Sequence, residues 1–157
     1  PEVYAVVETL KRRAGGGSEL LAYRSGPDWV DVRSGDINAF LKESTGEDVS
    51  AKDFRTWSAT VLMAVALAVS DGVSSESARK RAVTRAFKEV AGYLGNTPAV
   101  CRSSYVDPRI VDRYYAGETV ERSLMRLGET DGLASQGAIE AAVLNLLSGA
   151  PPVARAA

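Results

Sequence analysis

The chain has 157 residues, of which 45% are hydrophobic and 25% are charged, with a formal net charge of −1 and no histidine. This length and composition predict one compact domain with a hydrophobic core and leave too little chain for a second full domain. The lack of histidine excludes Ser-His-Asp and Cys-His catalysis and the usual histidine metal sites, and the single cysteine, Cys101, excludes an internal disulfide and a zinc finger.

The first third of the chain alternates helical patterns with turn signals. A helical pattern runs from about Glu2 to Arg13, and a glycine-rich stretch, Ala14 to Ser18, follows it. The stretch lacks the Gly-Lys-Ser/Thr ending of a phosphate-binding loop and therefore predicts a turn. After a short apolar segment, Leu20 to Tyr23, a second helix is predicted from Ser34 to Thr45, and the glycine that follows it is a stop signal.

The middle of the chain predicts two long helices. Ser50 begins the first, in a Ser-x-x-Asp sequence with the form of a capping box, and the sequence is apolar almost all round from Phe54 to Val69. That pattern is typical of a central, buried helix, and the apolar run is too short to cross a bilayer. The second helix, Ser77 to Leu94, ends at Gly95, which suits the C-cap. Its inner stripe consists of Ala82, Val83, Ala86, Phe87, Val90 and Leu94.

The last part of the chain predicts three shorter helices. Thr97 and Pro98 have the residue types of a helix cap and first turn, a second helix follows Pro108 to about Tyr115, and a third spans Ile139 to Leu147. Strand signals are few and there is no internal repeat. The expected fold class is therefore mainly α, with few or no strands.

We expect residues 1–149 to form one domain and residues 150–157, which contain two adjacent prolines, to be a flexible tail. The chain starts with Pro1, and no capping residue precedes the first helical pattern. We therefore also expect that the chain is part of a longer protein.

Two segments have residue types suited to phosphate chemistry. In the first, Lys52 and Arg55 are three residues apart on one face of a helix start, where unpaired N–H groups and the helix dipole favour an anion. An arginine there can grip two phosphate oxygens, although an ion pair with a nearby carboxylate is the plainer alternative. Positive charge is also concentrated between Arg79 and Arg113, which suits an anionic partner but is more typical of a solvated helix face.

The second segment runs from Gly95 through Asn96 and Thr97-Pro98 to Ser104-Tyr105 and Pro108. Tyr105 follows a short predicted helix and precedes a proline that breaks the pattern. Taken alone, Tyr105 is more typical of a half-buried packing residue than of a nucleophile, and Asn96 is an ordinary turn residue. Two other tyrosines nearby are candidates of equal standing: Tyr114 and Tyr115.

Together, the two segments resemble the poxvirus-like type IB DNA topoisomerases in their bacterial form. Arg55 matches the arginine that contacts the scissile phosphate, and Tyr105 matches the tyrosine that forms a 3′-phosphotyrosyl bond. Asn96 takes the position of a phosphate-binding histidine in the viral enzymes, as in the bacterial pattern. The resemblance implies the helical catalytic fold of type IB topoisomerases and tyrosine recombinases.

That resemblance implies an isomerase that relaxes supercoiled double-stranded DNA by cutting and rejoining one strand, without ATP, a metal or another cofactor. It also implies a monomer in the cytoplasm, associated with the nucleoid and not with a membrane. Residues expected to make weaker phosphate contacts are Lys52, Arg85 and Arg102.

The family also uses an upstream arginine and a hairpin lysine that acts as general acid, and neither can be assigned in this sequence. We therefore expect this chain alone to hold only part of an active site. Two alternatives remain open. A tyrosine recombinase or integrase shares the fold, although its box has His-x-x-Arg where this chain has Lys52-x-x-Arg55. A noncatalytic helical module that binds DNA or protein is the alternative from another class.

Overall fold

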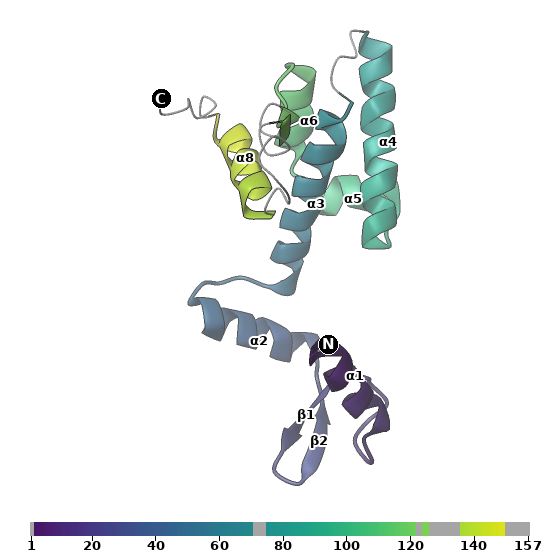
Figure 1. The fold of residues 1–157 in the computed structure, drawn as a ribbon, viewed down its shortest axis with the longest axis vertical. Helices are drawn as coiled ribbons and strands as arrows, with labels where there is room; N and C mark the ends of the chain where they lie inside the picture. Colours follow the sequence, from purple (N-terminus) through teal and green to yellow (C-terminus); the bar gives the residue numbers. More distant parts are fainter. Residues whose placement is uncertain (1, 71–74, 122–123, 126–135, 150–157) are drawn as a thin grey trace. The chain divides into compact units, whose positions relative to one another are not determined.

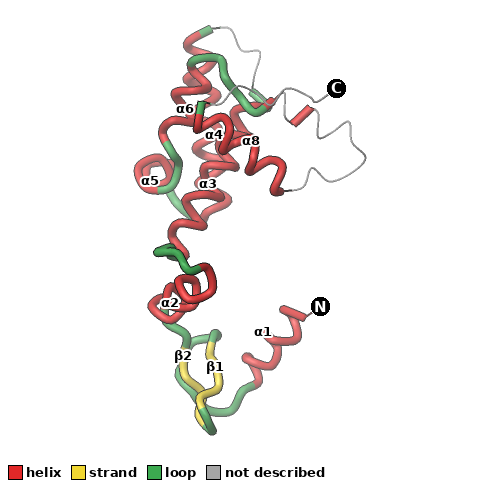
Figure 2. Tube along the Cα trace, turned by 90° about the vertical axis from the view of Figure 1, so that its left-hand side faces the viewer, coloured by secondary structure: helices red, strands yellow, loops and turns green. Residues whose placement is uncertain are grey.

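The computed structural model describes residues 2–70, 75–121, 124–125 and 136–149 (Figure 1). The chain divides into two compact units, residues 1–53 and 54–157. The described residues are mostly helical, with one two-stranded sheet (Figure 2). The mainly α fold is therefore confirmed. The predicted tail, residues 150–157, lies outside the described residues, and the predicted domain bounds stay a prediction.

The first unit contains α1 (Glu2–Arg12), β1 (Ala22–Ser25), β2 (Asp28–Asp31) and α2 (Ser34–Thr45). The two strands pair antiparallel, with Ala22 opposite Asp31, and a turn with Gly26 at φ 60° joins them. The apolar segment identified in the sequence therefore leads into a short β-hairpin that the sequence pattern did not specify.

The glycine-rich stretch is a loop, as predicted, and Arg13 organises it. The Arg13 side chain is 7% exposed. Its guanidinium donates to the carbonyl oxygens of Leu10 at 3.1 Å, Leu20 at 2.8 Å and Gly17 at 3.3 Å. Gly17 lies against Asp31 so closely that a Cβ there would be 1.8 Å from the carboxylate oxygen. The stretch is thus a closely packed connection between α1 and the hairpin.

Helix α2 has the predicted bounds. It ends at Gly46, whose φ of 72° is left-handed and whose N–H donates to the Lys42 carbonyl at 2.9 Å. Its apolar face is not buried, since no residue of α2 is buried and Phe40 is 67% exposed.

The second unit is built around α3 (Ala51–Ala68), which runs between α4 (Glu76–Leu94) and α8 (Gln136–Ser148) (Figure 1). Two short helices, α5 (Pro98–Ser104) and α6 (Pro108–Tyr115), complete the described bundle. All five helices contribute buried side chains to one core cluster, with Met63 and Leu67 of α3 among the most deeply buried residues. The apolar character of α3 is thus explained by a central position.

The helix ends from α3 onward follow the predicted signals. The Ser50 backbone N–H and hydroxyl both donate to the Asp53 carboxylate, at 2.8 and 2.6 Å. Gly95 has a φ of 67° and ends α4, and the Thr97 hydroxyl accepts the Val100 N–H at 3.3 Å at the start of α5. The buried stripe of α4 is the predicted one, with Ala91 in addition and Leu94 partly buried. None of the described helices has the length and apolarity needed to span a membrane.

Candidate active site

Arg55 contacts the end of α4 and the ring of Tyr105. Its guanidinium carbon lies 5.1 Å from the centre of the Tyr105 ring, and its Nη2 donates to the carbonyl oxygen of Leu94 at the end of α4. Within the described residues Arg55 has no ion pair with a carboxylate, so the plainer alternative for this residue does not apply there. The exposed guanidinium therefore keeps its charge available for an anion.

Tyr105 is the C-cap residue of α5, with φ −129° and ψ −29°. Its N–H donates to the Cys101 carbonyl at 3.1 Å, and the half-buried ring packs against the core cluster. Packing therefore fixes one side of the Tyr105 ring. The guanidinium of Arg55 also lies near this ring.

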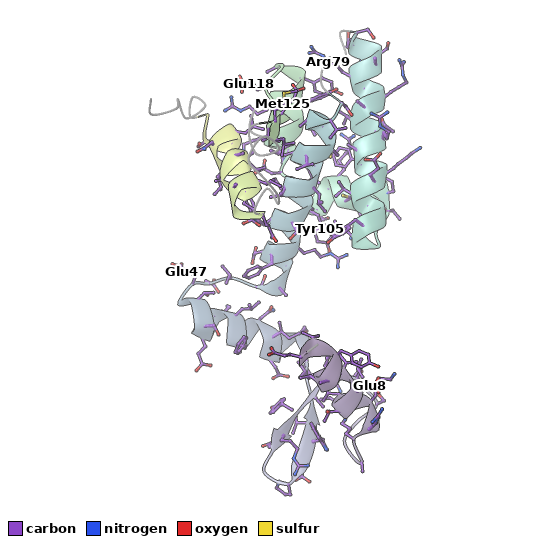
Figure 3. The ribbon with its side chains drawn as sticks, in the orientation of Figure 1. Glu8, Glu47, Arg79, Tyr105, Glu118 and Met125 are labelled. Atoms are coloured by element: carbon purple, nitrogen blue, oxygen red, sulfur yellow. The ribbon has the colours of Figure 1, made fainter. Side chains whose placement is uncertain are left out.

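The two rival tyrosines lie elsewhere. Tyr114 is only 4% exposed, and its hydroxyl donates to the Ser70 carbonyl at 3.3 Å. The carbonyl of the adjacent Tyr115 accepts from Arg79 at 2.9 Å. Figure 3 shows Tyr105 and Arg79 at opposite ends of α4. Ser70 follows Arg55 by 15 positions, or about 22 Å along a helix axis. Of the three tyrosines singled out in the sequence, the structure therefore brings only Tyr105 to Arg55.

Asn96 follows the left-handed Gly95 and is held through its backbone, whose N–H donates to the Ala91 carbonyl at 2.8 Å. Its side-chain Nδ2 is buried and has no hydrogen-bond partner among the described residues. A buried donor without a partner is destabilising, and a bound acceptor would relieve that cost. Arg55 hydrogen-bonds the chain two residues before Asn96 and also contacts the Tyr105 ring.

Of the residues expected to contact phosphates, Lys52 and Arg102 lie on the elements that carry the site. Lys52 is exposed in the first turn of α3, three residues before Arg55. Arg102 lies in α5, with its guanidinium carbon 4.1 Å from the centre of the Phe87 ring. Arg85 is different, because its Nη2 donates to the Ser70 hydroxyl at 2.8 Å. Arg85 is therefore tied to the C-terminal end of α3, whereas Tyr105 lies near Arg55 at the N-terminal end of that helix.

Arg85 belongs to a basic face of α4 that the sequence analysis did not single out as a unit. The face surrounds a shallow, open depression of about 400 Å³. Helical spacing could have identified it, because the residues repeat at three and four positions along α4. It is lined by Lys80, Arg81, Thr84, Arg85 and Lys88.

Thr60 is a second residue that the sequence analysis did not assign to the site. It is 2% exposed in α3, and its hydroxyl accepts the N–H of Asp107 at 3.1 Å. The same oxygen lies 3.5 Å from the Tyr105 carbonyl oxygen. Nothing in the sequence marks this contact, because it joins residues far apart in the chain.

The described residues contain no group of three or more His, Cys, Asp or Glu side chains that could hold a metal ion. Cys101 is fully buried next to the site, and burial raises the pKa of its thiol above the usual value. The Cys101 side chain therefore stays protonated at neutral pH and serves as a small apolar residue on the buried side of α5.

Residues 1–129 match the family described as eukaryotic DNA topoisomerase I, catalytic core. Over 78 residues, the chain is 33% identical to a protein named DNA topoisomerase 1B from Acanthamoeba polyphaga mimivirus. That alignment covers 48% of this chain and 23% of the viral protein, so the chain spans less than a quarter of that relative's length. The family match includes Arg55, Asn96 and Tyr105 and covers most of the chain. The chain therefore belongs to the family of eukaryotic-type DNA topoisomerase I catalytic cores, which are type IB topoisomerases.

Proposed function

We propose that the protein carrying this chain relaxes supercoiled double-stranded DNA by cutting one strand, holding its 3′ end on Tyr105, and rejoining it. The observation that carries the proposal is the position of the Arg55 guanidinium, 5.1 Å from the centre of the Tyr105 ring. Membership of the topoisomerase I family supports it.

The chemistry requires a cation beside the tyrosine. A tyrosine hydroxyl has a pKa near 10 and is a weak nucleophile at neutral pH. In the cleavage step a bond forms between the Tyr105 oxygen and phosphorus, and the bond from phosphorus to the 5′ oxygen breaks. The phenol loses its proton to solvent, and the departing 5′ oxygen gains one from a general acid. A nearby guanidinium stabilises both the phenolate and the charge that develops on the phosphate oxygens.

Arg55 and Asn96 have separate roles in this proposal. The planar fork of Arg55 binds two oxygens of the scissile phosphate. Asn96 donates a neutral hydrogen bond to the same group through its side-chain amide. Because the phosphotyrosyl ester retains the free energy of the broken bond, attack by the free 5′ hydroxyl reverses the step without ATP.

We assign the general-acid lysine and a second arginine to residues outside these 157. The resemblance to poxvirus-like enzymes supports this assignment, as does the much greater length of the mimivirus relative. This chain by itself is therefore proposed to bind DNA but to cleave it poorly. We further propose that the enzyme is of the bacterial, poxvirus-like form, because Asn96 stands where the viral enzymes have histidine. We also propose that it acts as a monomer on nucleoid DNA in the cytoplasm.

We propose that two groups of basic side chains bind DNA independently of its sequence. Lys52 and Arg102 lie on the helices that carry Arg55 and Tyr105, so they suit phosphates next to the scissile bond. Arg85, on the basic face of α4, suits a more distant stretch of the backbone. No base contact is implied by any of these residues.

Covalent trapping tests the proposal. Full-length protein and this chain alone are incubated with a nicked suicide DNA, denatured and digested, and the attached peptide is mapped. We expect an adduct at Tyr105 in the full-length protein and a much weaker one in the chain alone. Tyr105→Phe should abolish the adduct but keep DNA binding, whereas Tyr115→Phe, at a tyrosine that is 39% exposed, should form it normally. An adduct on another residue would refute the assignment of Tyr105.

A further inference from the structure

A buried hydroxyl in the middle of α3 connects this helix to the turn that follows Tyr105. Thr60 is 2% exposed, and its hydroxyl donates to the Thr56 carbonyl at 2.9 Å, one helical turn earlier. That bond alone satisfies the proton of a threonine in a helix. The oxygen nevertheless also accepts the N–H of Asp107, at 3.1 Å, from a residue 47 positions away.

The N–H of Asp107 depends on this contact. Asp107 is the N-cap of α6, so its own N–H precedes the helix and has no intrahelical carbonyl to bond. A part-buried backbone donor without a partner destabilises the fold, so the Thr60 oxygen fixes the chain at this point. The carbonyl oxygen of Tyr105 lies 3.5 Å from the same hydroxyl, close enough for a second, weaker contact.

The turn is also fixed on its other side. The N–H groups of Tyr105 and Val106 both donate to the Cys101 carbonyl, each at 3.1 Å. The backbone of Tyr105 is therefore held between the end of α5 and the Thr60 hydroxyl. Because α3 carries Arg55 as well as Thr60, a single rigid helix sets both the place of the cation and the place of the tyrosine backbone.

We propose that Thr60 is a positioning residue for Tyr105. By holding the backbone after Tyr105 against α3, it keeps the phenol oxygen in line with the phosphate that Arg55 binds. The inference rests on the proposed role of Tyr105 as the nucleophile. Thr60 itself touches no DNA and acts only through the tyrosine.

Replacement of the hydroxyl in the full-length protein tests this role. Thr60→Val keeps the branched shape and removes the acceptor, and Thr60→Ser keeps the hydroxyl. Thr9→Val is the matched control, because the Thr9 hydroxyl makes the same kind of bond, to the Ala5 carbonyl at 2.9 Å, at an exposed position of α1. The measurements are the rate and endpoint of covalent adduct formation at saturating suicide DNA, the Kd for uncleaved DNA, and the melting temperature.

We expect Thr60→Val to slow adduct formation by about 10- to 100-fold, since small misplacements of reacting groups have effects of that size. The Kd and the endpoint should stay at wild-type values, Thr60→Ser should restore most of the rate, and Thr9→Val should match wild type. If Thr60 serves stability alone, Thr60→Val would instead lower the melting temperature and the endpoint while the rate of the folded fraction stays normal. That outcome would overturn the proposal.

Two further outcomes separate this inference from the proposed function. A wild-type rate in Thr60→Val, with the adduct still mapped to Tyr105, overturns the positioning role and leaves the proposed function standing. A wild-type protein that forms no adduct at Tyr105 overturns both. Should Thr60→Val fail to fold, Thr60→Cys takes its place. Its thiol has nearly the same volume but accepts hydrogen bonds weakly, so a wild-type rate in that variant also rejects the proposal.

Discussion

Arg55 and Tyr105 are far apart in the sequence, yet the Arg55 guanidinium carbon lies 5.1 Å from the centre of the Tyr105 ring. At an exposed site, such a cation–ring contact stabilises by about 0.5–1 kcal/mol. The same guanidinium also donates to the Leu94 carbonyl, so Arg55 joins the end of α4 to the tyrosine. In this structure the arginine is therefore already held beside the residue whose charge it is proposed to stabilise.

Replacing Arg55 by lysine should lower the rate of covalent DNA cleavage by about 100-fold or more, the usual effect of losing a charge-stabilising donor. A lysine keeps the positive charge, but it cannot contact Leu94 and two phosphate oxygens with one planar fork. Single-turnover cleavage of suicide DNA by the full-length protein measures the effect. Arg12→Lys, at a side chain that is 81% exposed, is the control. A cleavage rate within a few-fold of wild type would rule out the fork geometry as the reason for arginine.

Replacing Lys52 or Arg85 by alanine should flatten the salt dependence of DNA binding. Each phosphate contact releases a counterion, so each lost contact should reduce the slope of log K against log salt by about 0.9. Lys11→Ala, which removes an exposed charge paired with Glu8, should leave the slope unchanged. The slope is measured by titrating labelled duplex DNA at several salt concentrations. An unchanged slope in Arg85→Ala would remove the basic face of α4 from the DNA-binding surface.

Two glycines near the end of α4 should respond in opposite directions to alanine. Gly95 has a φ of 67°, where an alanine is strained, so Gly95→Ala should lower the free energy of unfolding by about 1–2 kcal/mol. Gly92 lies within α4, where alanine is favoured by about 0.5–1 kcal/mol. A Cβ at either position meets nothing within 4 Å, so packing does not confuse the comparison. Urea denaturation of both variants provides the test, and equal shifts would contradict the cap assignment.

Stability in acid should depend on the contact between Asp107 and Arg109. The Arg109 side chain, hydrogen-bonded to the carboxylate at 2.6 Å, holds the pKa of Asp107 below its ordinary value. A carboxylate with a lowered folded pKa adds stability above its unfolded pKa of about 4, and this stability is lost as the pH falls through the folded value. Arg109→Met should therefore make the free energy of unfolding less dependent on pH below about 4. Denaturation curves from pH 7 down to the acid range measure this, with Arg12→Met as control, and parallel curves for wild type and Arg109→Met would disprove it.

The Cys101 thiol should react with a disulfide reagent much more slowly in the folded protein than in the unfolded one. The side chain is fully buried, and burial raises the pKa of the thiol, so both access and the thiolate fraction are reduced. We expect the rate at pH 8 to rise roughly tenfold or more when the protein is unfolded in urea. Similar rates in both states would mean that α5 opens readily and that Tyr105 is not rigidly held.

Helix bounds were predictable wherever the chain carries a clear cap. Gly46 and Gly95 end α2 and α4 in left-handed conformations, and Thr97-Pro98 starts α5. The β-hairpin was not predictable from the sequence, because β1 and β2 have only four residues each, and so short a pattern cannot be distinguished from a loop.

The candidate site was predictable only in part. The motifs singled out Arg55, Asn96 and Tyr105, and in the structure Arg55 contacts the Tyr105 ring and the Leu94 carbonyl. In the sequence pattern Thr60 only interrupts the apolar face of α3, and its bond to Asp107 depends on tertiary packing that no local rule describes. The tie between Arg85 and Ser70, which separates Arg85 from the tyrosine, is tertiary in the same way.

Helix α5 has seven residues and, with its N-cap Thr97, links Asn96 to Tyr105. Each residue of a helix advances the chain by about 1.5 Å and turns it by about 100°. The exposed positions of α5 can therefore accept many substitutions, but one inserted or deleted residue would swing Tyr105 about a quarter of a turn away from Arg55. In this segment the length of the chain is a stricter requirement than its composition, so insertions and deletions should be selected against even at positions where any side chain is tolerated.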